Sequence, residues 1–542
     1  MELTNTLKAA AIHPAINAID GSATIATPEK DVGWVSLLMV TAIGFFYLFT
    51  IRTGHEWGDD FSLYIMHAKN IASGLDYRHG AYLHYSPYLG PDAYPPIFPL
   101  LLAPVCFLFG VNLTAMKAVL IVTFLASLLA FRLVVKREIS PGWQVALITI
   151  IGLNPYLWDQ KDRLTSDLAF LVFAYLGVAL VNKAYQANTS EGRKWSLILA
   201  TGIVFYLAYG TRSLGLLLIP SLLLFDVIRN KKLVPSKFAL AVSGITLCLV
   251  VLQSYFLHSD KGYYDQFATS FHDSIGTWLR YIAGNLKGYA FSLTDIWDNG
   301  FNRLFRLGLT VTITALAIWG YLGRLRTNIA YADIFVSLYI IVVLIVPMDG
   351  GLRYLIPAIP FYVLYAQQGL FTLPLGKDLK YAAIAVIGIA ILVTYATKYS
   401  KQDFKHLPDG IEKAESVEFF NYVKQQTLAS DVFIFTKPRA LALFTDRRSS
   451  FYPMDLDDKG LWDYFQKIQA THIVLGPKGI SPEEQAFLTE FIGKYSGSLR
   501  EEFSNKDFNS YRIIGIPNAS GRTNYTRMRL TDPLPKGAPS SH

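Results

Sequence analysis

Residues 33–61 read GWVSLLMVTAIGFFYLFTIRTGHEWGDDF, an uncharged apolar run followed closely by the acid pair Asp59-Asp60. The run, residues 33–51, is long enough to cross a bilayer, since a transmembrane helix needs about 20 apolar residues at about 1.5 Å rise each. The two acids are therefore expected just outside the hydrocarbon, where a lipid-linked reagent meets a water-borne one. A carboxylate at that boundary is suited to chemistry on lipid carriers.

The composition fits a polytopic membrane protein, because 52% of the residues are hydrophobic and only 17% are charged. The net charge of +8 does not indicate nucleic acid, since Lys and Arg lie in short loops between apolar segments. Cys106 and Cys248 both fall inside apolar runs, which supports neither a disulfide framework nor a thiolate metal site. The histidines form no metal-binding pattern, and no glycine-rich phosphate loop occurs.

The hydropathy pattern predicts a mainly α-helical membrane bundle of about eleven transmembrane helices, with juxtamembrane helices and a small carboxy-terminal α/β domain. The expected crossings are residues 33–51, 113–135, 143–157, 164–181, 195–209, 214–228, 238–257, 304–321, 332–346, 352–372 and 381–397. Two further segments, residues 59–73 and 96–110, are expected as surface or re-entrant helices.

Basic residues recur in every second connection, as the positive-inside rule requires of cytoplasmic loops. The other connections then face outward, including the acid pair. The predicted organisation is a cytoplasmic segment at 1–32, a transmembrane domain at 33–399 with outward loops 52–112 and 258–303, an outward-facing soluble domain at 400–521 and a disordered tail at 522–542. Within the soluble part, residues 431–435, 471–475 and 511–516 read as buried strands, and Ser481-Pro482 opens a helix.

The acids of the outward loops are candidates for chemistry. Asp59 and Asp60 precede a predicted surface helix, where a carboxylate faces the positive end of the helix dipole and is expected to stay ionised. Helix capping alone accounts for the pair equally well. Asp167 comes directly before an apolar run, and an acid entering hydrocarbon implies a partner or a polar cavity. Its loop, residues 159–167, also contains Arg163, and solvated helix-cap chemistry is the alternative there.

Arg353 and Arg212 lie at the outer starts of predicted crossings. A guanidinium at that depth can bind a phosphate through two hydrogen bonds. Snorkelling, or an ion pair with an outward Asp, is the alternative, and it is at least as strong for Arg212. For Arg353, the adjacent Gly350-Gly351 permits close approach of a ligand, which favours a functional role.

Four segments, in order along the chain, resemble the membrane glycosyltransferases of the C-type fold. They are residues 59–64 (DDFSLY), 94–104 (YPPIFPLLLAP), 166–170 (SDLAF) and 353–360 (RYLIPAIP). The resemblance covers the membrane part and is to the bacterial branch of the protein O-mannosyltransferases and to the lipid A aminoarabinose transferases. It does not extend to the carboxy-terminal domain.

This resemblance implies an inverting glycosyltransferase of the bacterial inner membrane, with its active site on the periplasmic side. It would move a hexosyl or pentosyl group from a polyprenyl-phosphate donor to a hydroxyl of a protein, lipid or glycan acceptor. In that family an Asp-Glu-like pair in the first outward loop supplies the catalytic acid. The second position here is Asp60, a departure that keeps the base at Asp59 and leaves the role of Asp60 open.

The resemblance also implies the remaining roles. Asp167 resembles the acid of the second outward loop, and Arg353 resembles a basic residue near the donor phosphate. With Asp59 and Asp60 as the catalytic pair, the donor phosphate is assigned to Arg353, Arg163 and Arg212, and substrate contacts to Asp167, His84, Tyr85 and Tyr94. Aromatic residues near an interface are more often simple belt anchors, which is the alternative for the last three.

No cofactor is predicted, and a divalent metal is optional because a fixed cation is enough for a phosphate leaving group. The expected partners are the lipid-linked donor, the acceptor and membrane lipid, without nucleic acid. One alternative function is a membrane transporter, which the sequence favours less because no internal repeat is visible. Another is transfer of a lipid-linked oligosaccharide or a phospho-group.

Overall fold

The computed structural model describes residues 33–83, 93–186, 191–257, 274–300, 302–346, 350–407, 410–517 and 523–524. The chain divides into two compact units. The first comprises Met1–His55, Tyr64–His79 and Gly90–Leu407, and the second comprises Glu56–Leu63, Gly80–Leu89 and Pro408–His542. The predicted segment 1–32 lies outside the described residues, as does the predicted tail 522–542 except for Thr523–Asn524. The predicted domain boundary at residue 400 stays a prediction.

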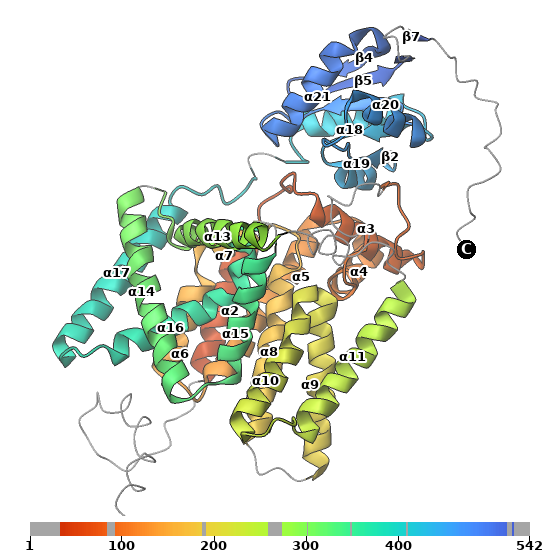
Figure 1. Cartoon of the computed structure of the whole chain (residues 1–542). Coiled ribbons are helices and arrows are strands. Elements are labelled where there is room, and N and C mark those ends of the chain that lie inside the picture. Colours follow the sequence, from red (N-terminus) through yellow and green to blue (C-terminus); the bar gives the residue numbers. More distant parts are fainter. Residues whose placement is uncertain are drawn as a thin grey trace, which may run out of the picture. The chain divides into compact units, whose positions relative to one another are not determined.

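The first unit is a bundle of apolar helices (Figure 1). Among the described residues, 6 helical stretches are long and apolar enough to cross a membrane. They are α5 (Leu113–Val135), α8 (Asp167–Gln186), η2 (Ser213–Leu217) with α10 (Leu218–Asn230), α11 (Lys237–Leu257), α14 (Arg303–Thr327) and α17 (Lys377–Tyr399). Shorter apolar helices are α2 (Gly33–Phe49), α4 (Ile97–Phe109), α6 (Pro141–Gly152) and α15 (Tyr331–Ile345). The mainly helical class is confirmed, whereas the predicted number of crossings is not.

Two predicted crossings are interrupted where proline occurs. The crossing expected at 143–157 ends with α6, and the short α7 (Pro155–Gln160) follows it. Pro155 occupies the first turn of α7, where its missing N–H leaves no partner unsatisfied, and the Asn154 side chain caps the helix by accepting from two backbone N–H groups. The crossing expected at 352–372 begins as the 3-10 helix η4 (Gly351–Ala358), and α16 (Ile359–Thr372) continues it. The loop that contains Arg163 follows α7 at the first interruption. Arg353 lies in η4 at the second.

Helices α14 and α16 approach each other through glycine. A Cβ atom added to Gly320 would lie 2.0 Å from the Tyr365 carbonyl oxygen, and one added to Gly369 would lie 2.0 Å from the Leu316 carbonyl oxygen. Only residues without side chains permit such close backbones, which is a common way for membrane helices to pack. Further helices among the described residues of the unit are α9 (Glu191–Thr211), α13 (Ile275–Ser292), η3 (Leu293–Trp297) and most of α3 (Asp60–Ser73). Helix α13 runs across the long helices (Figure 1).

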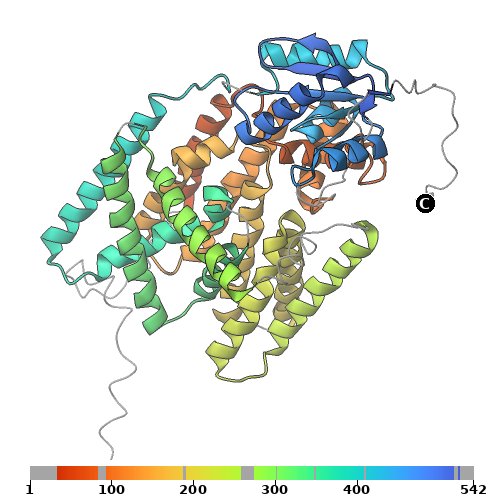
Figure 2. The same ribbon diagram turned by 45° about the horizontal axis from the view of Figure 1, so that its top comes forward.

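The second unit is built on a five-stranded sheet of order β2-β1-β3-β5-β4. Strands β1 (Val432–Ile434), β2 (Arg448–Ser450) and β3 (His472–Leu475) are parallel, whereas β5 (Asn509–Ile513) pairs antiparallel with β3 and with β4 (Leu499–Ser504). The helices are α18 (Ala414–Gln426), α19 (Pro438–Thr445), α20 (Asp458–Lys467) and α21 (Pro482–Lys494). Figure 2 shows them packed on the sheet. The structure thus contains the small α/β fold predicted for this end of the chain.

Two segments from the amino-terminal part of the chain are components of this second unit. Trp57 is buried among Phe420, Phe435 and Phe508, with ring centroids 5.7 to 5.9 Å away. Residues 81–83 run beside β2, where the Leu83 N–H donates to the Ser449 carbonyl at 2.8 Å. Burial of so large an aromatic ring and addition to a sheet edge both hold these segments in place. The acid pair next to Trp57 is positioned by the same contacts.

Candidate active site

Asp59 and Asp60 lie in the second unit, at the start of α3 (Asp60–Ser73). A third charged residue lies between them: Arg439, in the first turn of α19, is only 1% exposed. Its Nε atom is 3.6 Å from Asp59 Oδ2 and its Nη1 atom is 3.7 Å from Asp60 Oδ1. The ring of Tyr82 lies 5.2 Å from the guanidinium carbon. The structure therefore joins the predicted acid pair to a cation and an aromatic ring.

The carboxylate of Asp59 is buried without being satisfied. Both of its oxygens are inaccessible to solvent, and neither makes a hydrogen bond of ordinary geometry with the described residues, although the Ala440 backbone N–H lies near enough to lower the pKa slightly. Burial raises the pKa of Asp59 to about 6, although the nearby cations Arg439 and Lys437 act in the opposite direction. Burial of Asp59 therefore opposes the helix dipole, which favours an ionised carboxylate at this position. At pH 7 a group of this pKa is still ionised by about ten to one.

Asp167, Arg212 and Arg353 form a second cluster, in the first unit. Asp167 begins α8 and is 1% exposed. Arg353 Nε donates to Asp167 Oδ2 at 2.6 Å, and Arg212 Nη1 donates to Oδ1. The Arg212 guanidinium also lies over the Tyr354 ring, 5.4 Å from its centroid. Asp167 was expected to have a partner or a polar cavity, and among the described residues its partners are these two guanidinium groups.

Arg163 belongs to a third cluster, also in the first unit. It contacts Asp159 at 3.1 Å, and its side chain is 40% exposed. Arg52 bridges Asp159 and Asp162 at 2.6 and 2.7 Å. Lys161 contacts Asp162 at 2.6 Å, and Lys117 lies 3.7 Å from the same carboxylate. Burial lowers the pKa of Lys161 to about 8, partly offset by Asp162. Among the described residues, four basic side chains therefore lie around these two carboxylates.

The predicted sugar-contacting residues are placed only in part. Tyr94 is buried, and its ring stacks on Tyr64 with centroids 4.5 Å apart. Its backbone carbonyl accepts a hydrogen bond from the Tyr77 hydroxyl at 2.8 Å, so this stretch is held firmly within the first unit. His84 and Tyr85 lie outside the described residues. Their roles stay predictions.

Sequence reasoning missed Arg439, Tyr82, Arg52 and Lys117. Arg439 and Tyr82 are distant in sequence from Asp59, and no pattern links them to it. For Arg439 one signal was available, because Lys437 and Arg439 flank the start of a helix, where the dipole disfavours cations. Lys117 is a cation in the first turns of a mainly apolar predicted crossing, away from the basic residues at its other end, which is itself a sign of a buried partner. No group of three or more His, Cys, Asp or Glu side chains in the described part of the chain is placed to hold a metal.

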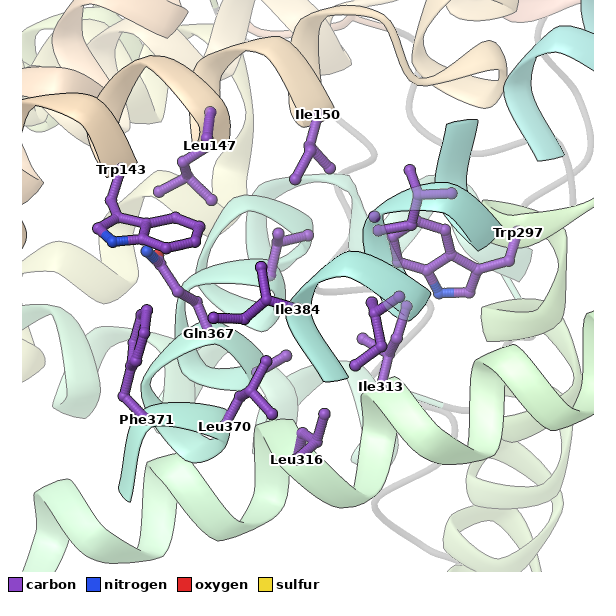
Figure 3. Close-up of a pocket in the computed structure, with 16 residues that line it drawn as sticks. Trp143, Leu147, Ile150, Trp297, Ile313, Leu316, Gln367, Leu370, Phe371 and Ile384 are labelled. Carbon is purple, nitrogen blue, oxygen red and sulfur yellow. The ribbon is translucent and has the colours of Figure 1, made fainter. Parts of the chain in front are cut away.

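A separate cavity of about 130 Å³ lies in the first unit, where residues of α6, α14, α16 and α17 meet. Its lining is apolar except for a few groups such as the Gln367 amide, and Figure 3 shows Trp143, Leu147, Leu370 and Phe371 around it. None of the predicted site residues lines this cavity. It is therefore a different feature from the three charged clusters.

Comparison with known proteins places this fold. No family model and no curated protein sequence matches the chain. Solved structures do match. ArnT from Cupriavidus metallidurans bound to undecaprenyl phosphate has a TM-score of 0.53 and 12% identity, over 89% of this chain and 98% of ArnT. The archaeal oligosaccharyltransferase AglB from Archaeoglobus fulgidus, in complex with an inhibitory peptide and a dolichol-phosphate, has a TM-score of 0.55 and 10% identity, over 93% of this chain and 75% of AglB.

The arabinofuranosyltransferase AftD from Mycobacteria matches with a TM-score of 0.51 and 11% identity, over 88% of this chain and 40% of AftD. At such low identities these matches show the fold and not the reaction. The chain has the C-type fold of membrane glycosyltransferases, as its motifs predicted.

Proposed function

We propose that this protein is an inverting glycosyltransferase that moves a sugar from a polyprenyl-phosphate to an acceptor hydroxyl. The observation that carries the proposal is the state of Asp59 within a C-type fold. Its carboxylate oxygens are buried and make no hydrogen bond of ordinary geometry with the described residues. Because an unsatisfied buried acceptor is costly, natural proteins rarely keep one without a use for it. A substrate hydroxyl that donates to Asp59 would remove this cost.

Asp59 is the general base of the proposed reaction. It takes the proton of the acceptor hydroxyl as the hydroxyl oxygen attacks the anomeric carbon from the face opposite the phosphate. The bond between that carbon and the phosphate oxygen breaks, and polyprenyl phosphate leaves with the bonding electron pair. A base works best when its pKa lies near the working pH, so a pKa of about 6 suits Asp59 better than the usual value for Asp. Asp60 is assigned to orienting the acceptor.

The phosphate of the donor is assigned to the first unit. Arg353 and Arg212 both donate to Asp167, and Arg163 belongs to the basic cluster around Asp159. A guanidinium group binds a phosphate oxygen through charge-assisted hydrogen bonds from its N–H groups. Fixed cations of this kind stabilise charge that builds up on a leaving phosphate. This mechanism requires no metal ion, and Asp167 serves to orient the two arginines.

The alternation of basic loops supports a periplasmic position for the reaction in a bacterial inner membrane. The acceptor is a hydroxyl of a protein, lipid or glycan, and substrate contacts are assigned to Tyr94, His84 and Tyr85. The matched solved structures support a transferase over a transporter, since they are transferases with lipid-phosphate ligands in two cases. Transfer of a single sugar is proposed because the motif resemblance is to enzymes of that kind.

The test is to incubate the purified protein with a panel of polyprenyl-phosphate sugars and with protein, lipid and glycan acceptors. We expect one donor to be consumed, with polyprenyl phosphate accumulating in equal amount to the transferred sugar. The product should have the anomeric configuration opposite to that of the donor. The matched control is Asp59→Asn, which keeps the shape of the side chain. Retention of configuration, or consumption of no donor in the panel, would contradict the proposal.

A further inference from the structure

We propose that Arg439, a residue of the carboxy-terminal α/β domain, is a positioning residue that holds the Asp59 carboxylate in place and balances its charge. Asp60 competes with Asp59 for the same guanidinium. This inference rests on the proposed role of Asp59 as the base. It gives the carboxy-terminal domain a direct effect on the Asp59 carboxylate, although the motif resemblance did not extend to that domain.

Arg439 lies in an unfavourable place for a cation. It lies in the first turn of α19, beside Lys437, and the positive end of the helix dipole repels both. It is also fully buried, and an arginine is almost never found buried unless it has an anionic partner. The carboxylates of Asp59 and Asp60 offset both costs. A chain that breaks two local rules at one residue usually does so at a functional site.

The contacts of Arg439 with the two carboxylates are electrostatic and are not hydrogen bonds. The distances of 3.6 and 3.7 Å from Arg439 to the two carboxylates are too long for hydrogen bonds but short enough for strong Coulomb attraction. The guanidinium therefore balances charge without occupying the lone pairs of Asp59. Those lone pairs stay available to accept a proton. The Tyr82 ring over the guanidinium adds a cation–π contact that fixes its position.

Arg439 and Asp60 act on the pKa of Asp59 in opposite directions. Burial is the largest cause of the raised pKa of Asp59; Arg439 lowers that pKa, whereas Asp60 raises it. Removal of the cation and removal of the second acid should therefore shift the titration of Asp59 in opposite directions. A purely structural tie between the segments predicts no such opposition. The sign of two shifts thus separates the two explanations.

The experiment measures the pH dependence of kcat/KM in the full-length protein for the wild type, Arg439→Gln, Arg439→Lys and Asp60→Asn. We expect the acid limb in Arg439→Gln to move up by about one pH unit or more, the usual effect of losing an opposite charge at this distance. Arg439→Lys should restore part of the shift. Asp60→Asn should move the limb down. The control is Arg448→Gln, which removes an exposed arginine of the same unit.

A second readout does not depend on activity. The melting temperature of each protein is compared with that of the same protein carrying Asp59→Asn, across pH, so that the difference reports the titration of Asp59. If Arg439→Gln fails to fold, Arg439→Lys and Asp60→Asn carry the test. The inference would be overturned if the titration midpoint of Asp59 were unchanged in both variants, or if it moved in the same direction in both. Retention of transfer by Asp59→Asn would instead overturn the proposed base, whatever the titration shows.

Discussion

Asp167 in the first unit and Asp59 in the second both have buried carboxylate oxygens, but the partners of these oxygens differ. Asp167 receives hydrogen bonds from Arg212 and Arg353, one on each oxygen. Asp59 has a cation nearby but no hydrogen bond of ordinary geometry from the described residues. Asp167 is therefore stabilised as an anion within its own unit. Asp59 is destabilised as an anion, with a pKa raised to about 6.

The difference teaches which acid is suited to proton transfer. A carboxylate whose lone pairs are occupied by two guanidinium groups is a poor base, because a proton must displace an ion pair. A carboxylate that is buried and unsatisfied gains from accepting a proton. In the proposed mechanism, Asp167 orients cations and Asp59 reacts. The two acids differ in whether cationic side chains donate hydrogen bonds to their oxygens.

The largest expected effect is on turnover. Asp59→Asn keeps the shape of the side chain but removes the base, so kcat should fall by about 10² to 10⁴-fold. Asp60→Asn should cause a smaller loss, because Asp60 is assigned only to orienting the acceptor. Measurement at saturating donor gives the ratio of the two variants, and the exposed Asp463→Asn serves as the control. Near-wild-type transfer by Asp59→Asn would remove the distinction between the two acids.

The next largest effect is on the stability of the first unit. Asp167→Asn leaves Arg212 and Arg353 facing each other without their carboxylate. Breaking a buried ion pair from one side costs about 3 to 5 kcal/mol, and we expect the lower end because Arg353 is 31% exposed. Thermal unfolding of the purified protein in detergent measures this loss. A stability equal to that of the wild type would show that Asp167 is not the anchor of its cluster.

A third effect concerns the donor. Arg353→Ala should weaken donor binding by about 1.5 to 3 kcal/mol, roughly 10- to 100-fold in Kd, through loss of a charge-assisted hydrogen bond. Arg353→Lys should recover only part of this, because a lysine cannot bind two oxygens in the same plane. Titration with a polyprenyl-phosphate sugar measures the change, and the exposed Arg326→Ala is the matched control. Donor affinity unchanged in Arg353→Ala would leave Arg353 with the structural role alone.

The smallest effect is a gain in stability at neutral pH. Because the pKa of Asp59 is raised from 3.8 to about 6 in the folded protein, the folded state binds more protons than the unfolded state between these values. The free energy of unfolding therefore falls as pH rises through this window. Asp59→Asn lacks this penalty and should be more stable than the wild type by about 1 to 3 kcal/mol at pH 7.5.

This advantage should shrink as pH falls from about 6 to about 4 and vanish below about pH 3, where Asp59 is protonated in both the folded and the unfolded state. Melting temperatures of the two proteins measured in parallel from about pH 3 to about pH 8 provide the check. A constant difference across this range would mean that Asp59 is not the buried acid the structure indicates. Loss of stability in Asp59→Asn at neutral pH would mean that its ion pair with Arg439 outweighs its burial.

The sequence allowed the helical class, the C-type fold and the small α/β domain to be predicted. Hydropathy and alternation are local properties, and residues 33–51 or 471–475 carry them without reference to the rest of the chain. The motifs around Asp59, Asp167 and Arg353 could be recognised for the same reason, because each is a short run of consecutive residues. The number of crossings was less predictable, because residues such as Pro155 and Pro357 interrupt apolar runs that look continuous by composition.

Tertiary structure alone decided which charges meet. That Asp167 needs a partner follows from the cost of an acid in hydrocarbon, but that its partners are Arg212 and Arg353 depends on how distant helices pack. The contact of Asp59 with Arg439 depends on the burial of Trp57 in the carboxy-terminal unit. Burial and charge balance are set by all the atoms within a few ångströms of a group. Most of those atoms come from elsewhere in the chain, so the pKa of Asp59 is a property of the fold.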